Sequence, residues 1–258
     1  MAADPMIGVT PPPSEGWALF LDVDGTLLEI APTPDAVTVG PELPELLARL
    51  SRRFGGGLAI VSGRCIAELD QLFYPFRFPA AGIHGIELRD ARGALHYAGL
   101  RDVDLEWARA ELRRFVGRHA GLILEDKGRA LALHFRQAPE LEAEVHRVLG
   151  RVLPGLPAAA HLQPGHCVVE LKSAAADKRT AIQRFLEEPP FAGRVPVFVG
   201  DDLTDHEGLA YVESIGGHAV FVGPAPRHVK GWLPNPAAVR AWLQSLADAP
   251  GPRAEHHP

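Results

Sequence analysis

The sequence predicts an α/β protein in which a doubly wound parallel sheet carries an inserted α+β cap. Short apolar runs alternate with helical patterns over residues 17–83 and again over 177–246, which is typical of parallel strands joined by helices. Between these stretches the pattern changes to helix, two strands, helix, two strands. The chain has 258 residues, enough for one large domain or two modest ones.

The first parallel stretch begins with an apolar run that ends abruptly in the polar sequence Asp-Val-Asp-Gly-Thr. Leucines at helical spacing follow, and three consecutive glycines stop that helix before the next apolar run. Buried parallel strands read as continuous apolar runs, so these runs fit a parallel sheet. The expected elements are a strand at 17–23, a helix at 43–50, a strand at 58–61, a helix at 66–73 and a strand at 80–83.

The middle of the chain is expected to form an antiparallel module of the order αββαββ. Apolar residues share one helical face over 105–115, and alternating strands then surround a turn at Gly128. The expected elements are a helix at 105–115, strands at 122–127 and 129–136, a helix at 141–152, and strands near 158–163 and 166–172.

The parallel pattern then resumes and ends in a helix that opens with Asn235-Pro236, a cap residue followed by proline at the first helical position. The expected elements are a helix at 177–186, a strand at 195–199, a helix after 203, a strand at 219–222 and a helix to 246. We therefore expect a catalytic core of 14–100 and 171–247, a cap of 101–170, and flexible tails at 1–13 and 248–258.

Composition argues against several classes of protein. With 26 basic and 32 acidic residues the net charge is −6, and no basic block is present, which argues against nucleic-acid binding. No apolar run approaches the roughly 20 residues of a membrane span, and the N-terminus lacks the apolar stretch of a secretory signal. Only Cys65 and Cys167 are present, which excludes a disulfide framework and favours a reducing, cytoplasmic location.

Four polar clusters follow predicted parallel strands or begin a helix. In open α/β sheets the ligand crevice lies beyond the carboxyl ends of the strands, so three of these clusters should converge there, and Lys178 could reach in from its helix start. They are Asp22 with Asp24, Ser62, Lys178, and Asp201-Asp202 with Asp205.

Converging carboxylates would repel one another unless a cation neutralises them, and a small set of hard oxygen ligands suits Mg²⁺. An aspartate can attack phosphorus to form an aspartyl phosphate, and a second carboxyl two residues away can serve as the acid and base. The hydroxyls of Thr26 and Ser62 would donate to phosphoryl oxygens, and Lys178 would stabilise their charge.

Each cluster also has an ordinary structural explanation. An Asp-x-Asp-Gly sequence can be a turn, Ser62-Gly63 can end a strand, and Lys178 can be a solvated lysine at a helix start. The acids at 201–205 can complement a helix dipole. His84, near the predicted crevice, can be a ligand or a structural residue.

In combination and in order, the clusters resemble the motifs of haloacid dehalogenase (HAD)-type phosphatases. The matching stretches are Asp22-Val23-Asp24-Gly25-Thr26, Val61-Ser62-Gly63-Arg64, Lys178, and Gly200-Asp201-Asp202-Leu203-Thr204-Asp205. Further stretches at 81–85 (AGIHG), 124–136 and 167–172 resemble trehalose-6-phosphate phosphatases, and the likeness covers residues 17–245. The family usually has glycine after the motif lysine, where this chain has Arg179.

The resemblance implies roles for individual residues. Asp22 would be the nucleophile, Asp24 the general acid and base, and Ser62 and Lys178 phosphate ligands. Mg²⁺ would be held by Asp22, the main-chain carbonyl of Asp24, and Asp201. Further site candidates are Arg64, His84, Arg136, Asp202 and Asp205.

The strand period of the cap independently indicates two unlike faces. Glu125 and Lys127 share one face of their strand, and Glu170 lies opposite the apolar residues of its own strand. On the intervening strand His134 and Arg136 oppose an apolar set. A face of charged groups suits a neutral polyhydroxylated ligand, although it could also be a solvated sheet face. The resemblance implies that Glu125, Lys127 and Glu170 grip the sugar.

We therefore expect a Mg²⁺-dependent phosphatase that hydrolyses trehalose 6-phosphate through an aspartyl-phosphate intermediate. The alternatives are a phosphatase for another sugar phosphate, such as sucrose 6-phosphate, or a phosphomutase. A phospho-accepting receiver module uses similar residues, but receivers are about half this length and lack a cap. A sugar-phosphate sensor without activity is a fourth alternative, against which the intact Asp22 and Asp24 argue. The expected partner is the small-molecule substrate.

Overall fold

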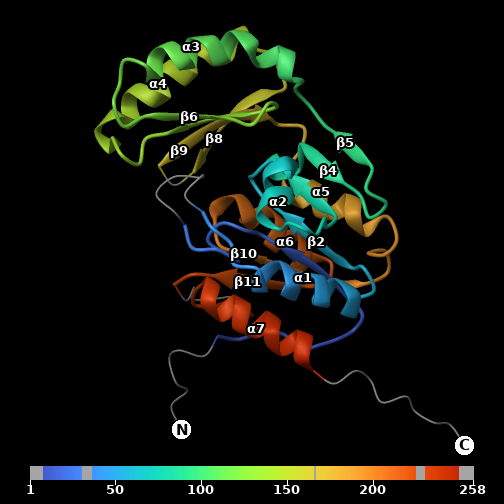
Figure 1. Cartoon of the computed structure of the whole chain (residues 1–258). Coiled ribbons are helices and arrows are strands. Elements are labelled where there is room, and N and C mark those ends of the chain that lie inside the picture. The colour runs from blue at the N-terminus through green and yellow to red at the C-terminus, as the bar shows by residue number, and fades with distance from the viewer. Residues whose placement is uncertain (1–7, 31–36, 166, 225–229, 250–258) are drawn as a thin grey trace, which may run out of the picture.

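A computed structural model describes residues 8–30, 37–165, 167–224 and 230–249. These residues form two separate sheets, each with its own helices (Figure 1). The larger sheet has eight strands and the smaller has four. Within the described residues, no helix is both long enough and apolar enough to span a membrane.

The large sheet has the order β12-β11-β10-β1-β2-β3-β4-β5, and its first six strands run parallel. β1 is the first of these in the chain, yet it lies between β10 and β2, so the strand order reverses there. The crevice at such a reversal is the usual ligand site of open α/β sheets. The parallel strands are β1 (Trp17–Leu21), β2 (Leu58–Val61), β3 (Ala80–Gly82), β10 (Val195–Gly200), β11 (His218–Val222) and β12 (Gly231–Leu233).

Helices cover both faces of this sheet, which is why its central strands are apolar on both sides. On one face, α1 (Glu42–Arg53), α2 (Ile66–Leu72) and α7 (Pro236–Asp248) pack on alternate residues of β1 and β2. On the other face, α5 (Lys178–Leu186) and α6 (His206–Ser214) pack on the intervening residues of the same strands. The doubly wound α/β fold predicted from the sequence is confirmed.

The small sheet has the order β6-β7-β9-β8 and is antiparallel throughout. Its strands are β6 (Ile123–Asp126), β7 (Leu131–His134), β8 (Ala160–Gly165) and β9 (Val168–Ser173), and its helices are α3 (Glu106–Val116) and α4 (Glu142–Val152). The predicted αββαββ order is confirmed. Leu131, Leu133 and Leu171 are buried in the core that this sheet forms with its helices.

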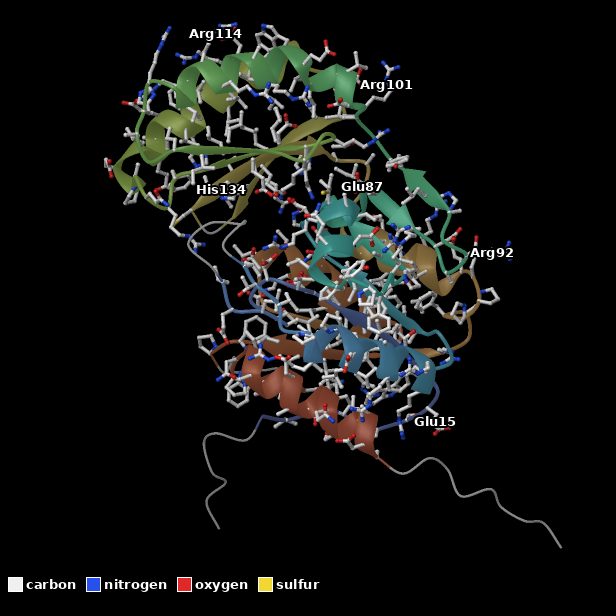
Figure 2. The ribbon with its side chains drawn as sticks, viewed as in Figure 1. Glu15, Glu87, Arg92, Arg101, Arg114 and His134 are labelled. Carbon is white, nitrogen blue, oxygen red and sulfur yellow. The ribbon has the colours of Figure 1, made fainter. Side chains whose placement is uncertain are left out.

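The other face of the small sheet points toward the large one. Figure 2 shows His134 on the side of the small sheet nearest the large sheet, whereas Arg114 lies on the outer surface of α3. The apolar and polar faces predicted from the strand period are therefore both present.

Three strands were not predicted from the sequence. β4 (Glu87–Arg89) and β5 (Leu95–Tyr97) extend the sheet as an antiparallel hairpin beyond β3, and β12 forms the opposite edge. Each has only three residues, too few for a periodic signal. Val9, within the N-terminal segment expected to be flexible, forms a bridge with Trp232 of β12. The domain boundaries remain a prediction, and β9 passes through the expected boundary at 170/171.

Candidate active site

Three neighbouring strands of the large sheet deliver the predicted polar clusters to one place. Asp22 directly follows β1, Ser62 follows β2, and Asp201 follows β10. The carboxyl ends of these parallel strands lie at one edge of the sheet, where α5 begins with Lys178. One cavity at this edge is lined by Asp22, Asp24, Ser62 and Lys178 together with charged residues of the small sheet.

The loop after β1 depends on a glycine. Gly25 has a φ of +86°, and a Cβ atom built there would lie 2.0 Å from Oδ2 of Asp201. Thr26 Oγ1 donates a hydrogen bond to Asp201 Oδ1 at 2.9 Å. The Asp-Gly-Thr sequence thus brings the loops after β1 and β10 together and orients Asp201.

Lys178 is placed by the cap of its own helix. The side chain of Asp177 accepts a hydrogen bond from the backbone N–H of Thr180 at 2.6 Å, which fixes the start of α5. Lys178 Nζ then donates to Asp22 Oδ1 at 2.7 Å and to Asp205 Oδ1 at 2.6 Å. Burial opposes the charge of this lysine, but the two carboxylates outweigh it and raise its pKa.

Asp205 is a support for this lysine and for the loop after β10. Besides Lys178, it accepts hydrogen bonds on Oδ2 from the backbone N–H groups of Asp201 and Asp202, at 3.1 and 3.0 Å. Asp202 accepts from the N–H of Leu203 at 2.7 Å, as a helix cap does. Asp202 also lines the cavity.

Carboxylate oxygens of Asp22, Asp201 and Asp205 lie within 4.8 Å of one another, close enough to share a cation. Burial, together with the Asp205 and Asp24 charges, raises the pKa of Asp22 to about 7 despite the opposing Lys178. Burial and the Asp22 charge raise the pKa of Asp201 to about 8. Three carboxylates thus surround one lysine, and burial disfavours their charged forms, so this set of oxygen donors fits a hard divalent cation.

Asp24 has a different environment from Asp22. Arg64 donates from Nε to Asp24 Oδ2 and from Nη2 to Oδ1, both at 2.7 Å, in a bidentate pair that fixes the plane of the carboxylate. Ser62 Oγ accepts a hydrogen bond from the Arg64 N–H at 3.2 Å and is buried. Arg64, a further candidate from the sequence, therefore acts on Asp24.

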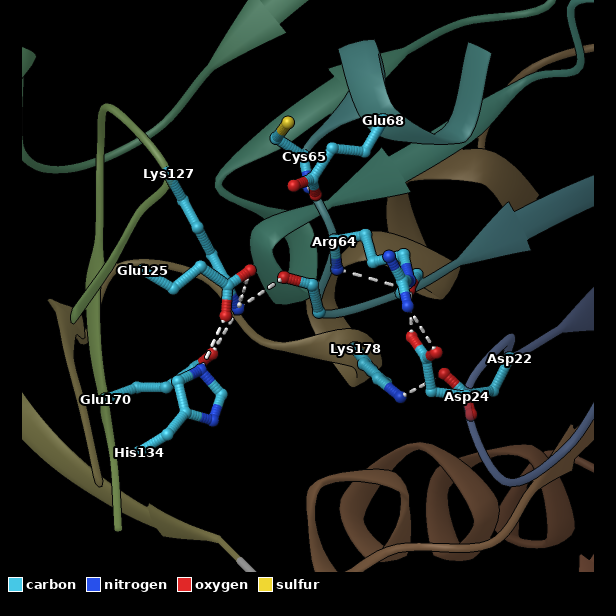
Figure 3. Close-up of polar contacts among 12 residues, drawn as sticks. Asp22, Asp24, Arg64, Cys65, Glu68, Glu125, Lys127, His134, Glu170 and Lys178 are labelled. Carbon is cyan, nitrogen blue, oxygen red and sulfur yellow. Dashed lines mark hydrogen bonds and ion pairs between the residues drawn. The ribbon is translucent and has the colours of Figure 1, made fainter. Parts of the chain in front are cut away.

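The polar face of the small sheet forms the opposite side of the cavity (Figure 3). Lys127 Nζ donates to Glu170 Oε1 at 2.5 Å and to the carbonyl of Gly63 at 2.9 Å, so it links the small sheet to the loop after β2. Glu125 Oε2 lies 2.7 Å from Nε2 of His134. Burial opposes the charge of each of these acids, but His134 and Lys127 lower the pKa of Glu125, and Lys127 and His84 lower that of Glu170.

His84 lies between the two sheets. Its Nε2 is 2.8 Å from Glu170 Oε2, and both side chains are buried. Burial lowers the pKa of His84 to about 4, with the lysines 172 and 178 acting in the same direction and Glu170 against it. The ring is therefore neutral near pH 7.

The structure brings most of the predicted site residues to one cavity, but Asp201 and Asp205 lie behind it and are not in its described lining. Thr26 is the exception among the predicted phosphate ligands: it is buried, its hydroxyl serves Asp201, and it is absent from the described cavity lining. Arg136 lines the cavity. The contact of Lys127 with Gly63 had no signal in the sequence, because it depends on how the two sheets approach each other.

The lowered pKa of His84 predicts a pH-dependent stability. Between the folded pKa of about 4 and the ordinary value of 6.5, the unfolded chain binds more protons than the folded protein. The stability contributed by the neutral ring is present above about pH 6.5 and is lost as the pH falls toward 4. Between about pH 7 and about pH 4.5 the free energy of unfolding should fall in the wild type. In His84→Asn we expect this fall to be smaller by about 2 kcal/mol.

Urea unfolding at the two pH values measures this difference. His146 is exposed on α4, so His146→Asn should follow the wild type. Equal losses in wild type and His84→Asn would show that His84 is not held neutral by burial.

Comparison with known proteins places this site in a family. Residues 20–225 match the family described as Trehalose-phosphatase. The chain is 43% identical over 235 residues to the probable trehalose-phosphate phosphatase of Sinorhizobium fredii, covering 90% of this chain and 88% of that protein. It is 42% identical over 240 residues to the trehalose-6-phosphate phosphatase of Escherichia coli, covering 93% and 90%.

Solved structures share the fold. The C-terminal domain of the Candida albicans trehalose-6-phosphate phosphatase superposes with a TM-score of 0.76 at 22% identity, covering 91% of this chain and 92% of that one. A trehalose-6-phosphate phosphatase related protein gives 0.72 at 24% identity, covering 89% and 96%. A HAD-superfamily phosphatase from Bacteroides thetaiotaomicron gives 0.58 at 16% identity, covering 92% and 98%. The chain therefore belongs to the trehalose-phosphatase family and is a phosphoric monoester hydrolase.

Proposed function

We propose that this enzyme hydrolyses trehalose 6-phosphate to trehalose and phosphate through an aspartyl phosphate on Asp22. The observation that carries the proposal is a single cavity lined on one side by Asp22 and Lys178 and on the other by Glu125, Lys127 and Glu170. A sugar phosphate has the same division, with an anionic end and a neutral polyhydroxylated end. The names of the two relatives above support trehalose 6-phosphate as the substrate.

The anionic end would bind beside the carboxylate cluster. Lys178 would stabilise charge on the phosphoryl oxygens, and the Ser62 hydroxyl would donate to one of them. An oxygen of Asp22 attacks phosphorus while the bond from phosphorus to the sugar oxygen breaks. Asp24 gives its proton to the leaving alkoxide, so trehalose departs as the neutral alcohol.

The second step returns the enzyme to its starting form. Asp24 takes a proton from a water molecule, whose oxygen attacks the phosphorus of the aspartyl phosphate. The bond from phosphorus to Asp22 breaks, inorganic phosphate leaves, and the Asp22 carboxylate is restored. The bidentate contact with Arg64 would orient Asp24, and each of its oxygens keeps a second lone pair that can take up the proton.

Mg²⁺ is the proposed cofactor. The carboxylates of Asp22 and Asp201 would hold it, and the family resemblance adds the main-chain carbonyl of Asp24. Both oxygens of Asp205 already accept hydrogen bonds, so Asp205 would serve by fixing Lys178 and the loop after β10. When bound, the cation offsets negative charge between the carboxylates and the phosphoryl group and polarises a phosphoryl oxygen.

Glu125, Lys127 and Glu170 are proposed to hold the sugar distal to the phosphate. Ionised groups make stronger hydrogen bonds to hydroxyls than neutral groups do. The lowered pKa values of both acids and the raised pKa of Lys127 support charged forms, since Lys127 is flanked by Glu170 and Glu125 despite its burial.

Cys65 and Cys167 are free thiols, which supports action in the reducing cytoplasm.

Replacing the nucleophile should stop the reaction. In Asp22→Asn the amide cannot form the aspartyl phosphate, so phosphate release from trehalose 6-phosphate should fall at least about a thousandfold. A malachite-green assay measures it, with Asp102→Asn on the exposed surface as the matched control. Turnover near the wild-type rate in Asp22→Asn would rule out this nucleophile.

Mg²⁺ should both activate and stabilise the protein. Chelation should abolish turnover, and Mg²⁺ should raise the melting temperature in a concentration-dependent way, because a ligand that binds the folded state stabilises it. The rise should be lost in Asp201→Asn and kept in Glu213→Gln, an exposed substitution on α6. Full activity in chelator, with no thermal shift, would contradict the proposal.

The cap should discriminate between substrates. Glu125→Ala should lower kcat/KM for trehalose 6-phosphate by about 10- to 100-fold, as expected for a hydrogen bond to a charged group. The factor by which kcat/KM falls on trehalose 6-phosphate should be about ten times the factor on p-nitrophenyl phosphate, or more, because the latter substrate has no distal sugar. Glu140→Ala, an exposed change, is the control. Equal losses of kcat/KM on both substrates would show that Glu125 does not recognise the sugar. If the wild type hydrolyses sucrose 6-phosphate faster than trehalose 6-phosphate, the proposed substrate is wrong.

A further inference from the structure

The turn after β3 has an unusual backbone. Ile83 and His84 have φ values of +48° and +55°, in the left-handed region that a β-branched residue such as Ile83 rarely occupies. Residues held in this region are strained and persist only where the surrounding structure holds them, commonly at binding and catalytic sites. Ile83 and His84 are both buried.

The turn is held by the two segments that carry the phosphate-binding residues. The N–H of His84 donates to the carbonyl of Ser62, and that of Ile83 to the carbonyl of Arg64, both at 2.9 Å. A Cβ atom at Gly85 would lie 2.7 Å from the carbonyl oxygen of Asp177, the residue before Lys178. The turn is thus fixed against the loop after β2 and the start of α5.

This strained turn presents the His84 ring to the small sheet. A Cβ atom at Gly63 would lie 2.8 Å from Cε1 and Nε2 of the ring, so glycine leaves the room that the imidazole occupies. Nε2 lies 2.8 Å from Glu170 Oε2. Two lone pairs would repel at that distance, so Nε2 carries the proton of the neutral ring.

Glu170 is thereby restrained through both of its oxygens. Lys127 donates to Oε1, and His84 lies against Oε2. Oε2 is buried, and its close contact with His84 is not aligned as a hydrogen bond, so among the described residues Oε2 lacks a well-directed donor. A carboxylate oxygen has two lone pairs, so Oε2 can accept a donor from a ligand while His84 limits its rotation.

We propose that His84 is a positioning residue for sugar recognition: it orients Glu170 so that Oε2 accepts a sugar hydroxyl. The inference rests on the proposed function of Glu170 and adds a residue of the large sheet to substrate specificity. His84 acts through Glu170 and is not a catalytic residue. The backbone of His84 contacts the loop after β2, which carries the proposed phosphate ligand Ser62. The sugar and the phosphate would therefore be held at a fixed distance from each other.

A double-mutant cycle tests whether His84 acts through Glu170. The four proteins are wild type, His84→Asn, Glu170→Ala and the double variant. Asparagine tolerates a positive φ but is too short to reach Glu170. His84→Gln, with an amide N–H at greater reach, is the rescue variant, and His84→Gly replaces His84→Asn if the latter does not fold. Each protein is assayed for kcat/KM on trehalose 6-phosphate and on p-nitrophenyl phosphate.

His84→Asn should lose about tenfold or more in kcat/KM on trehalose 6-phosphate, with a clearly smaller loss on p-nitrophenyl phosphate. In the Glu170→Ala background the same substitution should cost less than about twofold, because the interaction is already gone. His84→Gln should recover most of the lost specificity.

The inference would be overturned if His84→Asn lowered kcat/KM by the same factor with and without Glu170. Equal losses of kcat/KM on the two substrates would also overturn it. In either case the proposed function stands. A wild-type enzyme inactive on trehalose 6-phosphate would instead overturn the proposed function. The same four proteins would then report the coupling on the sugar phosphate that the wild type hydrolyses fastest.

Discussion

The contact of Lys178 with Asp22 and Asp205 is the interaction on which the arrangement of this site depends. A buried ammonium group is tolerated only where carboxylates surround it, and removing one partner leaves an uncompensated buried charge. Lys178 connects the end of β1 to the loop after β10, at distances of 2.7 and 2.6 Å. With Asp201 nearby, the cluster keeps an excess of negative charge that suits a cation.

The small sheet adds a second charged group on the opposite side of the same cavity. Lys127 connects Glu170 to the carbonyl of Gly63, so a side chain of the small sheet contacts the loop that also carries Ser62. The proposed phosphate and sugar contacts would therefore be linked through one loop. This geometry favours a ligand that has both an anionic end and a hydroxylated end.

Much of this arrangement could be predicted from the sequence, because it follows from regular structure. Asp22 and Ser62 come directly after apolar parallel strands, so their meeting at one sheet edge follows from the topology. The strand period likewise separated Glu125 and Glu170 from the apolar face of the small sheet.

Contacts between distant loops carried no such signal. The pairing of Arg64 with Asp24 and the hydrogen bond from Thr26 to Asp201 depend on loop conformations that no periodicity encodes. The positive φ of His84 could not be predicted either, because histidine, unlike glycine, does not by itself indicate a left-handed backbone conformation.

The identity of the nucleophile is tested most directly by a crystal structure of the protein with Mg²⁺ and beryllium fluoride, a mimic of a phosphoryl group bound to a carboxylate. We expect beryllium on an oxygen of Asp22, with Lys178 Nζ within hydrogen-bonding distance of a fluorine and the cation between Asp22 and Asp201. Beryllium fluoride bound to a different carboxylate, or a cation bound away from Asp22 and Asp201, would contradict the proposed chemistry.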